Sequence, residues 1–146
     1  MGKTSAAKPQ GCTNFKLRQL QRRVSQIYDR ELAECGLKTT QYSLLTHIEK
    51  LQPLAQGELA GRMGMDASTL SRNLRPLIAN GWVALDAGPD ARTHSLRLTE
   101  HGVAIRRAAQ SAWKRAQLGL NARVGEEKVV KLHQLIDELT ETLEAA

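Results

Sequence analysis

AQGELAGRMGMDASTLSRNLRPLIANGWVALDAGPDARTHSLRL, residues 55–98, is the stretch that decides the fold of this chain. It predicts two short helices, a tight turn between them, and then a β-hairpin. The first helix is expected over Gln56–Met63, because its apolar residues recur at helical spacing. Gly64 follows where a chain leaving a helix needs a positive φ, which glycine adopts without a Cβ penalty. Asp66 stands where an N-cap side chain accepts the free N–H groups of a second helix.

The second helix has one apolar face and one polar face. The apolar face consists of Leu70, Leu74, Leu77 and Ile78. The opposite face holds Ser68, Thr69, Ser71, Arg72, Asn73 and Arg75. No acid occurs between Ala67 and Leu85, whereas a merely solvated face usually mixes both charge signs. Short hydroxyls reach phosphates or base edges, and arginine offers a planar fork for guanine O6 and N7. The pattern is typical of a DNA-binding helix-turn-helix, with an ordinary helical hairpin as the alternative.

The hairpin favours the DNA-binding interpretation. Trp82–Asp86 and His94–Leu98 are expected strands, and the second alternates polar and apolar residues. The loop Ala87–Thr93 is rich in turn formers and too long for a two-residue turn. We interpret it as a wing with Arg92 near its tip, where an arginine can enter a narrow minor groove. Asp90 is either a partner that orients Arg92 or a turn-forming aspartate.

Several motifs occur together in one order along the chain. The helix-turn-helix is followed by Gly81-Trp82, by the D-x-R pattern of Asp90 and Arg92, and by the L-T-x-x-G run Leu98–Gly102. In this order and spacing they resemble the MarR family of winged-helix regulators. The resemblance extends from about Phe15 to Leu143. It implies a mostly α fold with a small β-hairpin wing, in which the N- and C-terminal helices form a dimerisation region. It also implies double-stranded DNA as the partner, and a small phenolic or aromatic effector.

The flanking helices predict a second subunit. Val129, Leu132, Ile136, Leu139 and Leu143 of the last helix recur at steps of three and four, which is a coiled-coil-like seam. The chain's own domain or a partner subunit must cover this seam, and we favour a homodimer. The expected organisation is a flexible basic tail at 1–12, a helical dimerisation region at 13–36 and 100–146, and a winged helix-turn-helix DNA-binding domain at 37–99.

Composition limits the other function classes. The chain has 146 residues and a net charge of +6, which favours an acidic partner such as nucleic acid. It has no apolar run long enough for a bilayer, so we expect a cytoplasmic protein without membrane contact. It lacks a glycine-rich phosphate loop and a G-x-S-x-G motif, and its four histidines are scattered, so we expect no enzyme, cofactor or metal. A non-specific architectural DNA-binding protein remains an alternative, although the polar helix face argues against it.

Two further hypotheses concern regulation. Tyr28, Tyr42, His47 and Trp113 are the residues placed where an effector pocket of such a regulator could form. Cys12 lies at the start of the first helix, where the helix dipole and a nearby lysine favour the thiolate. Organic-hydroperoxide sensors of the resembled family use a cysteine near that place, so a redox-sensing regulator is an alternative.

Overall fold

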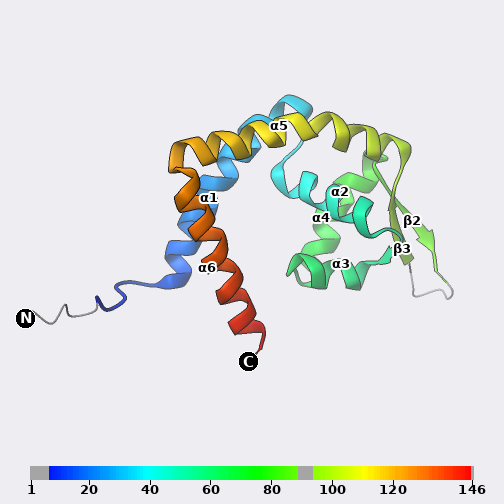
Figure 1. Ribbon diagram of the computed structural model, residues 1–146. Helices are drawn as coiled ribbons and strands as arrows, with labels where there is room; N and C mark the ends of the chain where they lie inside the picture. Colours follow the sequence, from blue (N-terminus) through cyan, green and yellow to red (C-terminus); the bar gives the residue numbers. More distant parts are fainter. Residues whose placement is uncertain (1–6, 89–93, 146) are drawn as a thin grey trace, which may run out of the picture.

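The computed structural model describes residues 7–88 and 94–145 (Figure 1). Its elements are α1 (Thr13–Leu32), the 3-10 turn η1 (Ala33–Cys35), α2 (Thr39–Leu51), β1 (Leu54–Ala55), α3 (Gln56–Met63), α4 (Ala67–Ala79), β2 (Val83–Ala87), β3 (His94–Leu98), α5 (Glu100–Val124) and α6 (Glu126–Glu144). The mostly helical fold with a small β-hairpin agrees with the sequence prediction. The observed β2 begins and ends one residue later than expected.

The helices α2, α3 and α4 and a small sheet form one compact module, which we call the reader module (Figure 1). The sheet has the order β1-β3-β2 and is antiparallel. Hairpin pairing runs from Val83 opposite Leu98 to Ala87 opposite His94. The short strand β1 was not expected, because two residues are too few for a period-2 pattern. It pairs with the free edge of β3, with Leu54 opposite Leu96.

The core of the reader module is aliphatic. Leu70, Leu74 and Leu77 of α4 are buried against a leucine- and isoleucine-rich cluster that includes α2, α3 and β3. The expectation that Ile78 shares this buried face is wrong, since its side chain is 41% exposed. Each helical residue advances by about 100°, which puts Ile78 at the margin of the leucine stripe.

The start of α2 is fixed by a contact from another helix. The Thr39 N–H donates to Asp29 Oδ1 of α1 over 2.7 Å, and the Lys38 N–H donates to Gln41 Oε1 over 2.9 Å. Free N–H groups at a helix start are costly to bury unpaired. Asp29 therefore connects α1 directly to the reader module.

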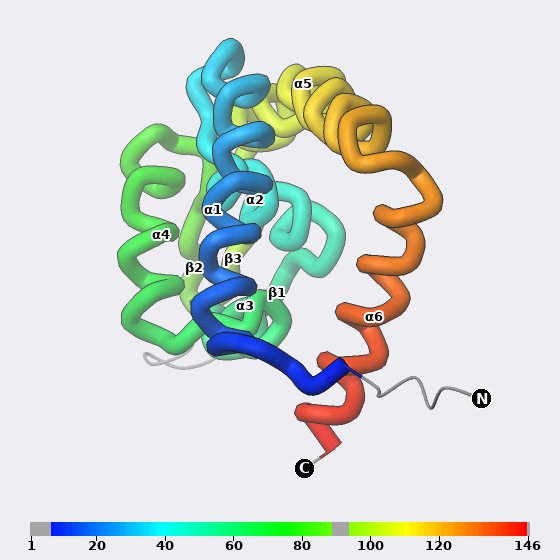
Figure 2. Tube along the Cα trace, turned by 90° about the vertical axis from the view of Figure 1, so that its left-hand side faces the viewer, coloured from blue at the N-terminus to red at the C-terminus, as the bar shows by residue number. Residues whose placement is uncertain are grey.

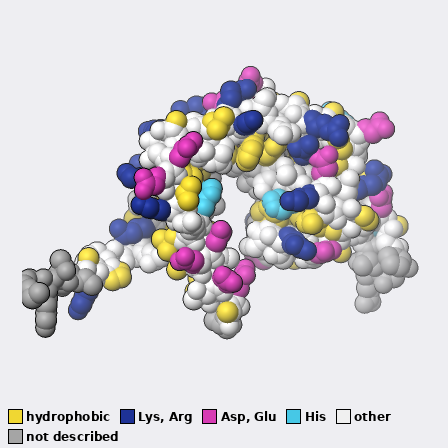
Figure 3. Space-filling view, viewed as in Figure 1, with side chains coloured by type: hydrophobic (Ala, Val, Ile, Leu, Met, Phe, Trp, Pro, Cys, Tyr) yellow, Lys and Arg dark blue, Asp and Glu magenta, His cyan; other side chains and the backbone are white. Residues whose placement is uncertain are grey.

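The long helix α5 joins the reader module to two arms, α1 and α6 (Figure 1). α1 packs along α5 and is held there by ion pairs of Arg115 with Glu31 and Glu34. α6 contacts α5 near their junction and stands apart from α1 (Figure 2). A hollow separates the arms from the reader module in the space-filling view (Figure 3).

Both arms expose large apolar side chains. Leu17 and Leu20 of α1 are 54% and 45% exposed, and Leu139 and Leu143 of α6 are 50% and 75% exposed. Of the expected α6 seam, only Val129 is buried. Within the described part of the chain, no helix has the length and apolar character needed to span a bilayer.

Candidate nucleic-acid interface

The turn between α3 and α4 has the predicted glycine and cap. Gly64 adopts φ 64°, a left-handed conformation that glycine tolerates without strain. Asp66 caps α4, because its carboxylate accepts the Thr69 N–H over 2.7 Å. The helix then runs through Pro76 to Ala79 without a break. The turn and cap hold α4 at a defined angle to α3 and set which of its faces points outward.

The polar residues of α4 differ in their exposure. Ser68, Arg72 and Arg75 are exposed on the side opposite the leucine stripe. Thr69 and Ser71 are half-buried at the margins of this face. Asn73 is also half-buried, and its Nδ2 lies 3.7 Å from Met65 Sδ, so it turns toward the α3–α4 turn rather than outward. The outward face of α4 is therefore centred on Ser68, Arg72 and Arg75.

Local hydrogen bonds orient the side chains of this face. Ser68 Oγ donates to Asp66 Oδ1 over 2.9 Å, which leaves the lone pairs of the hydroxyl for an incoming donor. Arg72 Nη2 lies 3.5 Å from Thr69 Oγ1. The Thr69 N–H, the Ser68 hydroxyl and nearby Arg72 hold the pKa of the Asp66 carboxyl below its usual range. Base amino groups are donors and guanine O6 and N7 are acceptors, so this face carries groups for both.

The base of the wing carries an ion pair that the sequence analysis missed. Arg97 Nε of β3 lies 2.6 Å from Asp86 Oδ2 of β2, and both side chains are about half exposed. The alternation of polar residues on the two strands was the available signal. The predicted wing residues Asp90 and Arg92 lie outside the described residues.

A cavity of about 510 Å³ lies among α1, α2 and α5. The four residues proposed for an effector pocket, Tyr28, Tyr42, His47 and Trp113, all line it. The rings of Tyr42 and Trp113 stack with centroids 6.2 Å apart. The sequence analysis missed Thr46, Arg106 and Gln110, which also line the cavity. Helical spacing alone did not identify them, since they face the cavity only once α5 crosses α2.

The polar groups of the cavity are mostly paired with protein groups. The Tyr28 hydroxyl donates to Gln117 Oε1, and burial raises the pKa of Tyr28. Arg106 forms an ion pair with Glu49. His47 Nδ1 lies 2.7 Å from the Ser43 carbonyl oxygen. The buried Thr46 Oγ1, by contrast, has no hydrogen-bond partner among the described residues. The cavity thus offers an aromatic wall and one unsatisfied hydroxyl.

Comparisons with known proteins place this geometry in a family. A family model described as "MarR family" matches residues 36–93. The transcriptional regulator MosR of M. tuberculosis, solved in complex with DNA, is 33% identical and superimposes with a TM-score of 0.73. That match covers 88% of this chain and 98% of MosR. The chain belongs to the MarR family. The resemblance seen in the sequence is therefore confirmed, and the MarR family is one of DNA-binding transcriptional regulators.

Other relatives agree with this assignment. The uncharacterized HTH-type transcriptional regulator YwoH of Bacillus subtilis is 28% identical over 85 residues, which are 58% of this chain. The chain spans 62% of the length of that curated relative. MarR of E. coli, complexed with operator DNA, is 20% identical over 86% of this chain and 91% of that chain, with a TM-score of 0.79. The last comparison bears on the fold alone.

The remaining predicted residues of this MarR-family chain lie away from the reader module. Cys12 is exposed at the N-cap of α1 and makes no side-chain cap hydrogen bond. Cys35 is half-buried, with its Sγ 3.9 Å from the Ala108 carbonyl oxygen. Across residues 7–88 and 94–145, no three or more His, Cys, Asp or Glu side chains are grouped to hold a metal ion.

Proposed function

We propose that this MarR-family chain is a homodimeric repressor that binds a palindromic double-stranded DNA operator. α4 enters the major groove and the wing contacts the minor groove. A small aromatic or phenolic effector in the cavity among α1, α2 and α5 releases the DNA. The single observation that carries the proposal is the outward face of α4. Ser68, Arg72 and Arg75 project to solvent, opposite a leucine stripe that fixes the helix.

Two copies are needed for useful discrimination. One recognition helix contacts few base pairs, and a two-fold axis gives two helices that read half-sites about one helical turn apart. The exposed apolar side chains of α1 and α6 supply a surface for a second copy. The related MosR structure with DNA supports a DNA complex for this chain as well.

The cavity lies where a ligand contacts both parts of the molecule. Tyr28 belongs to the α1 arm, Tyr42 to α2 of the reader module, and Trp113 to α5, which connects them. A ligand shifts a conformational equilibrium only through different affinities for two states. A molecule wedged among these three helices favours one spacing of the two reader modules, and we assign release to the spacing that no longer fits the operator.

The test is a footprint on the DNA flanking the gene, combined with salt titration and competition. We expect symmetric protection of two half-sites, and binding that weakens steeply with salt because phosphate contacts release counterions. Binding that random DNA competes as effectively as the protected site would replace this proposal by the architectural one. A Cys12→Ser variant that keeps its response to aromatic effectors but loses a response to peroxide would favour the redox alternative.

A further inference from the structure

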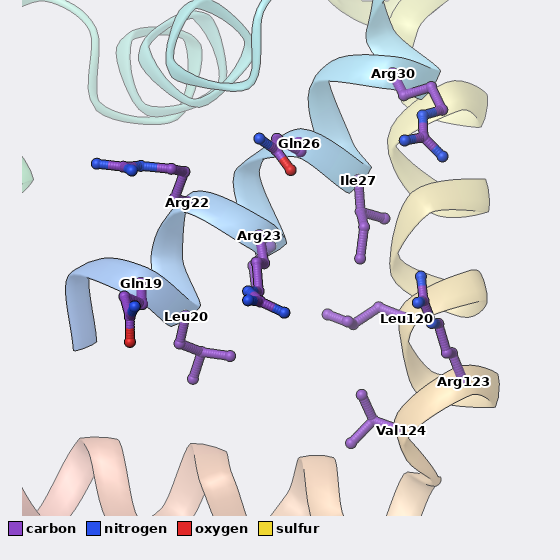
Figure 4. Close-up of a pocket in the computed structure, with 11 residues that line it drawn as sticks. Gln19, Leu20, Arg22, Arg23, Gln26, Ile27, Arg30, Leu120, Arg123 and Val124 are labelled. Atoms are coloured by element: carbon purple, nitrogen blue, oxygen red, sulfur yellow. The ribbon is translucent and has the colours of Figure 1, made fainter. Parts of the chain in front are cut away.

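A second cavity, of about 700 Å³, lies between α1 and the C-terminal end of α5 (Figure 4). Leu20, Ile27, Leu120 and Val124 point into it, and arginines of both helices surround this apolar floor (Figure 4). We call this surface, lined by α1 and the end of α5, the arginine groove. Leu20 and Val124 are 45% and 41% exposed, so the floor is open to solvent.

The positive charge of the arginine groove is uncompensated. Its lining includes Arg23, Arg30 and Arg123 and no acidic residue. Among the described residues, none of these three arginines forms an ion pair. Open apolar surface surrounded by one sign of charge is unusual for a solvated face, and it fits an occupant that is both apolar and acidic.

The C-terminal half of α6 has these complementary properties. From Asp137 to Glu144 it carries four acids and no lysine or arginine. Ile136, Leu139 and Leu143 are 45%, 50% and 75% exposed on one stripe of the same segment. Acidic side chains are visible along the lower part of α6 in the space-filling view (Figure 3). None of its four acids forms an ion pair with a residue that the structure describes.

The chain's own α6 does not occupy the groove. α6 leaves α5 at Gly125 and stands apart from α1 (Figure 2). We propose that the arginine groove receives the C-terminal half of α6 from a second copy of this chain. By two-fold symmetry each copy gives its α6 and accepts the other's, so the contact occurs twice. This inference rests on the proposed homodimer and adds that opposite charges on α1–α5 and α6 select and orient the partner.

The groove side of the contact is tested with two neighbouring arginines. The Arg23 side chain extends toward the apolar floor, whereas the guanidinium of Arg22 extends away from Leu20 (Figure 4). Arg22 also lines a shallow depression on the other side of α1, with Arg18 and Ser25. We expect Arg23→Glu to raise the dimer dissociation constant by at least about tenfold in sedimentation equilibrium, because it sets like charges together. Arg22→Glu is the matched control and leaves the constant near the wild-type value.

The α6 side is tested in the same way. At about 100° per residue, Asp137 and Glu144 lie in one row beside the apolar stripe, and Glu141 lies opposite it. We expect the double variant Asp137→Lys/Glu144→Lys to weaken the dimer about as much as Arg23→Glu. Glu141→Lys makes the same charge change on the opposite side of the helix and leaves the dimer intact. Circular dichroism of each variant separates lost pairing from lost folding.

Mixing the two weakened variants decides the pairing. In a mixed dimer, Glu at position 23 faces Lys on the partner α6, and the unaltered Arg23 faces the unaltered acids. We therefore expect an equimolar mixture to form heterodimers although each variant alone dissociates. A wild-type dimer that Arg23→Glu leaves unchanged, or a mixture that stays monomeric, overturns this inference and leaves the homodimer standing. A wild-type chain that is monomeric at high concentration overturns the homodimer itself.

Discussion

Gly102, in the first turn of α5, lies directly against the carbonyl group of Trp82. A Cβ added at Gly102 would stand 2.0 Å from the Trp82 carbonyl oxygen, well inside contact distance. The same carbonyl accepts the Thr99 N–H over 3.0 Å, and the Thr99 hydroxyl donates to the Gly81 carbonyl over 2.6 Å. These contacts join the end of the DNA-reading segment to the helix that leads to the arms. The L-T-x-x-G pattern is thus the sequence form of a close backbone approach.

Gly102→Ala is expected to destabilise the protein by about 1–3 kcal/mol, because neither backbone can move without breaking the Thr99 contacts. Thermal unfolding measures the change. Gly119→Ala on the same helix is the control. An added Cβ there meets nothing within 4 Å, and alanine in a helix interior is favoured over glycine by roughly 0.5–1 kcal/mol. Equal effects of the two substitutions would contradict the steric argument.

Arg72→Ala and Arg75→Ala are expected to reduce discrimination between the operator and random DNA. A lost bidentate base contact is worth roughly 1–3 kcal/mol, and Asn73→Ala should cost less because Asn73 faces Met65. Binding is measured by fluorescence anisotropy on both DNA sequences. Arg107→Ala, an exposed arginine of α5, is the control for loss of charge alone. Unchanged operator preference in both α4 variants would remove these arginines from base recognition.

Asp66 gives a pH-dependent test of the α4 cap. The pKa of its carboxyl is lowered in the folded protein, chiefly by the Thr69 N–H. The stabilisation from the cap is therefore fully present above the unfolded pKa of about 3.9, and it is lost as the pH falls through the folded value. We expect Asp66→Ala to lower the melting temperature at neutral pH and to converge with the wild type in strong acid. Asp66→Asn, which keeps a capping oxygen, separates capping from charge. A melting-temperature gap that persists in strong acid would contradict this account.

Thr46 links stability to effector binding. Its buried hydroxyl oxygen has no partner in the part of the chain that the structure describes. Thr46→Val removes an unsatisfied polar group at nearly constant volume, so we expect the free protein to gain on the order of 1 kcal/mol. The same variant should bind hydroxylated aromatic effectors more weakly, which calorimetry measures with phenol-type ligands. Ser43→Ala, on the same cavity wall, is the comparison. A variant that is less stable yet binds equally well would contradict a ligand-facing hydroxyl.

Much of the reader module was predictable because its signals are local. Gly64 and Asp66 were recognised from the backbone demands of a helix end and a helix start. The leucine stripe of α4 follows from helical periodicity. The periodicity failed at Ile78 and Asn73, which lie at the stripe's margins, where neighbouring elements decide burial.

The sequence by itself determined the helix-turn-helix, the hairpin and the apolar seam of α6, because each depends on residues within a few turns of one another. Only the tertiary structure decided what distant segments make together. It brought Thr46 and Arg106 beside the predicted aromatic residues, and it placed Asp29 of α1 at the start of α2. It also set arginines of α1 and α5 around one open apolar floor. These groupings depend on the crossing of long helices, which no short-range pattern encodes.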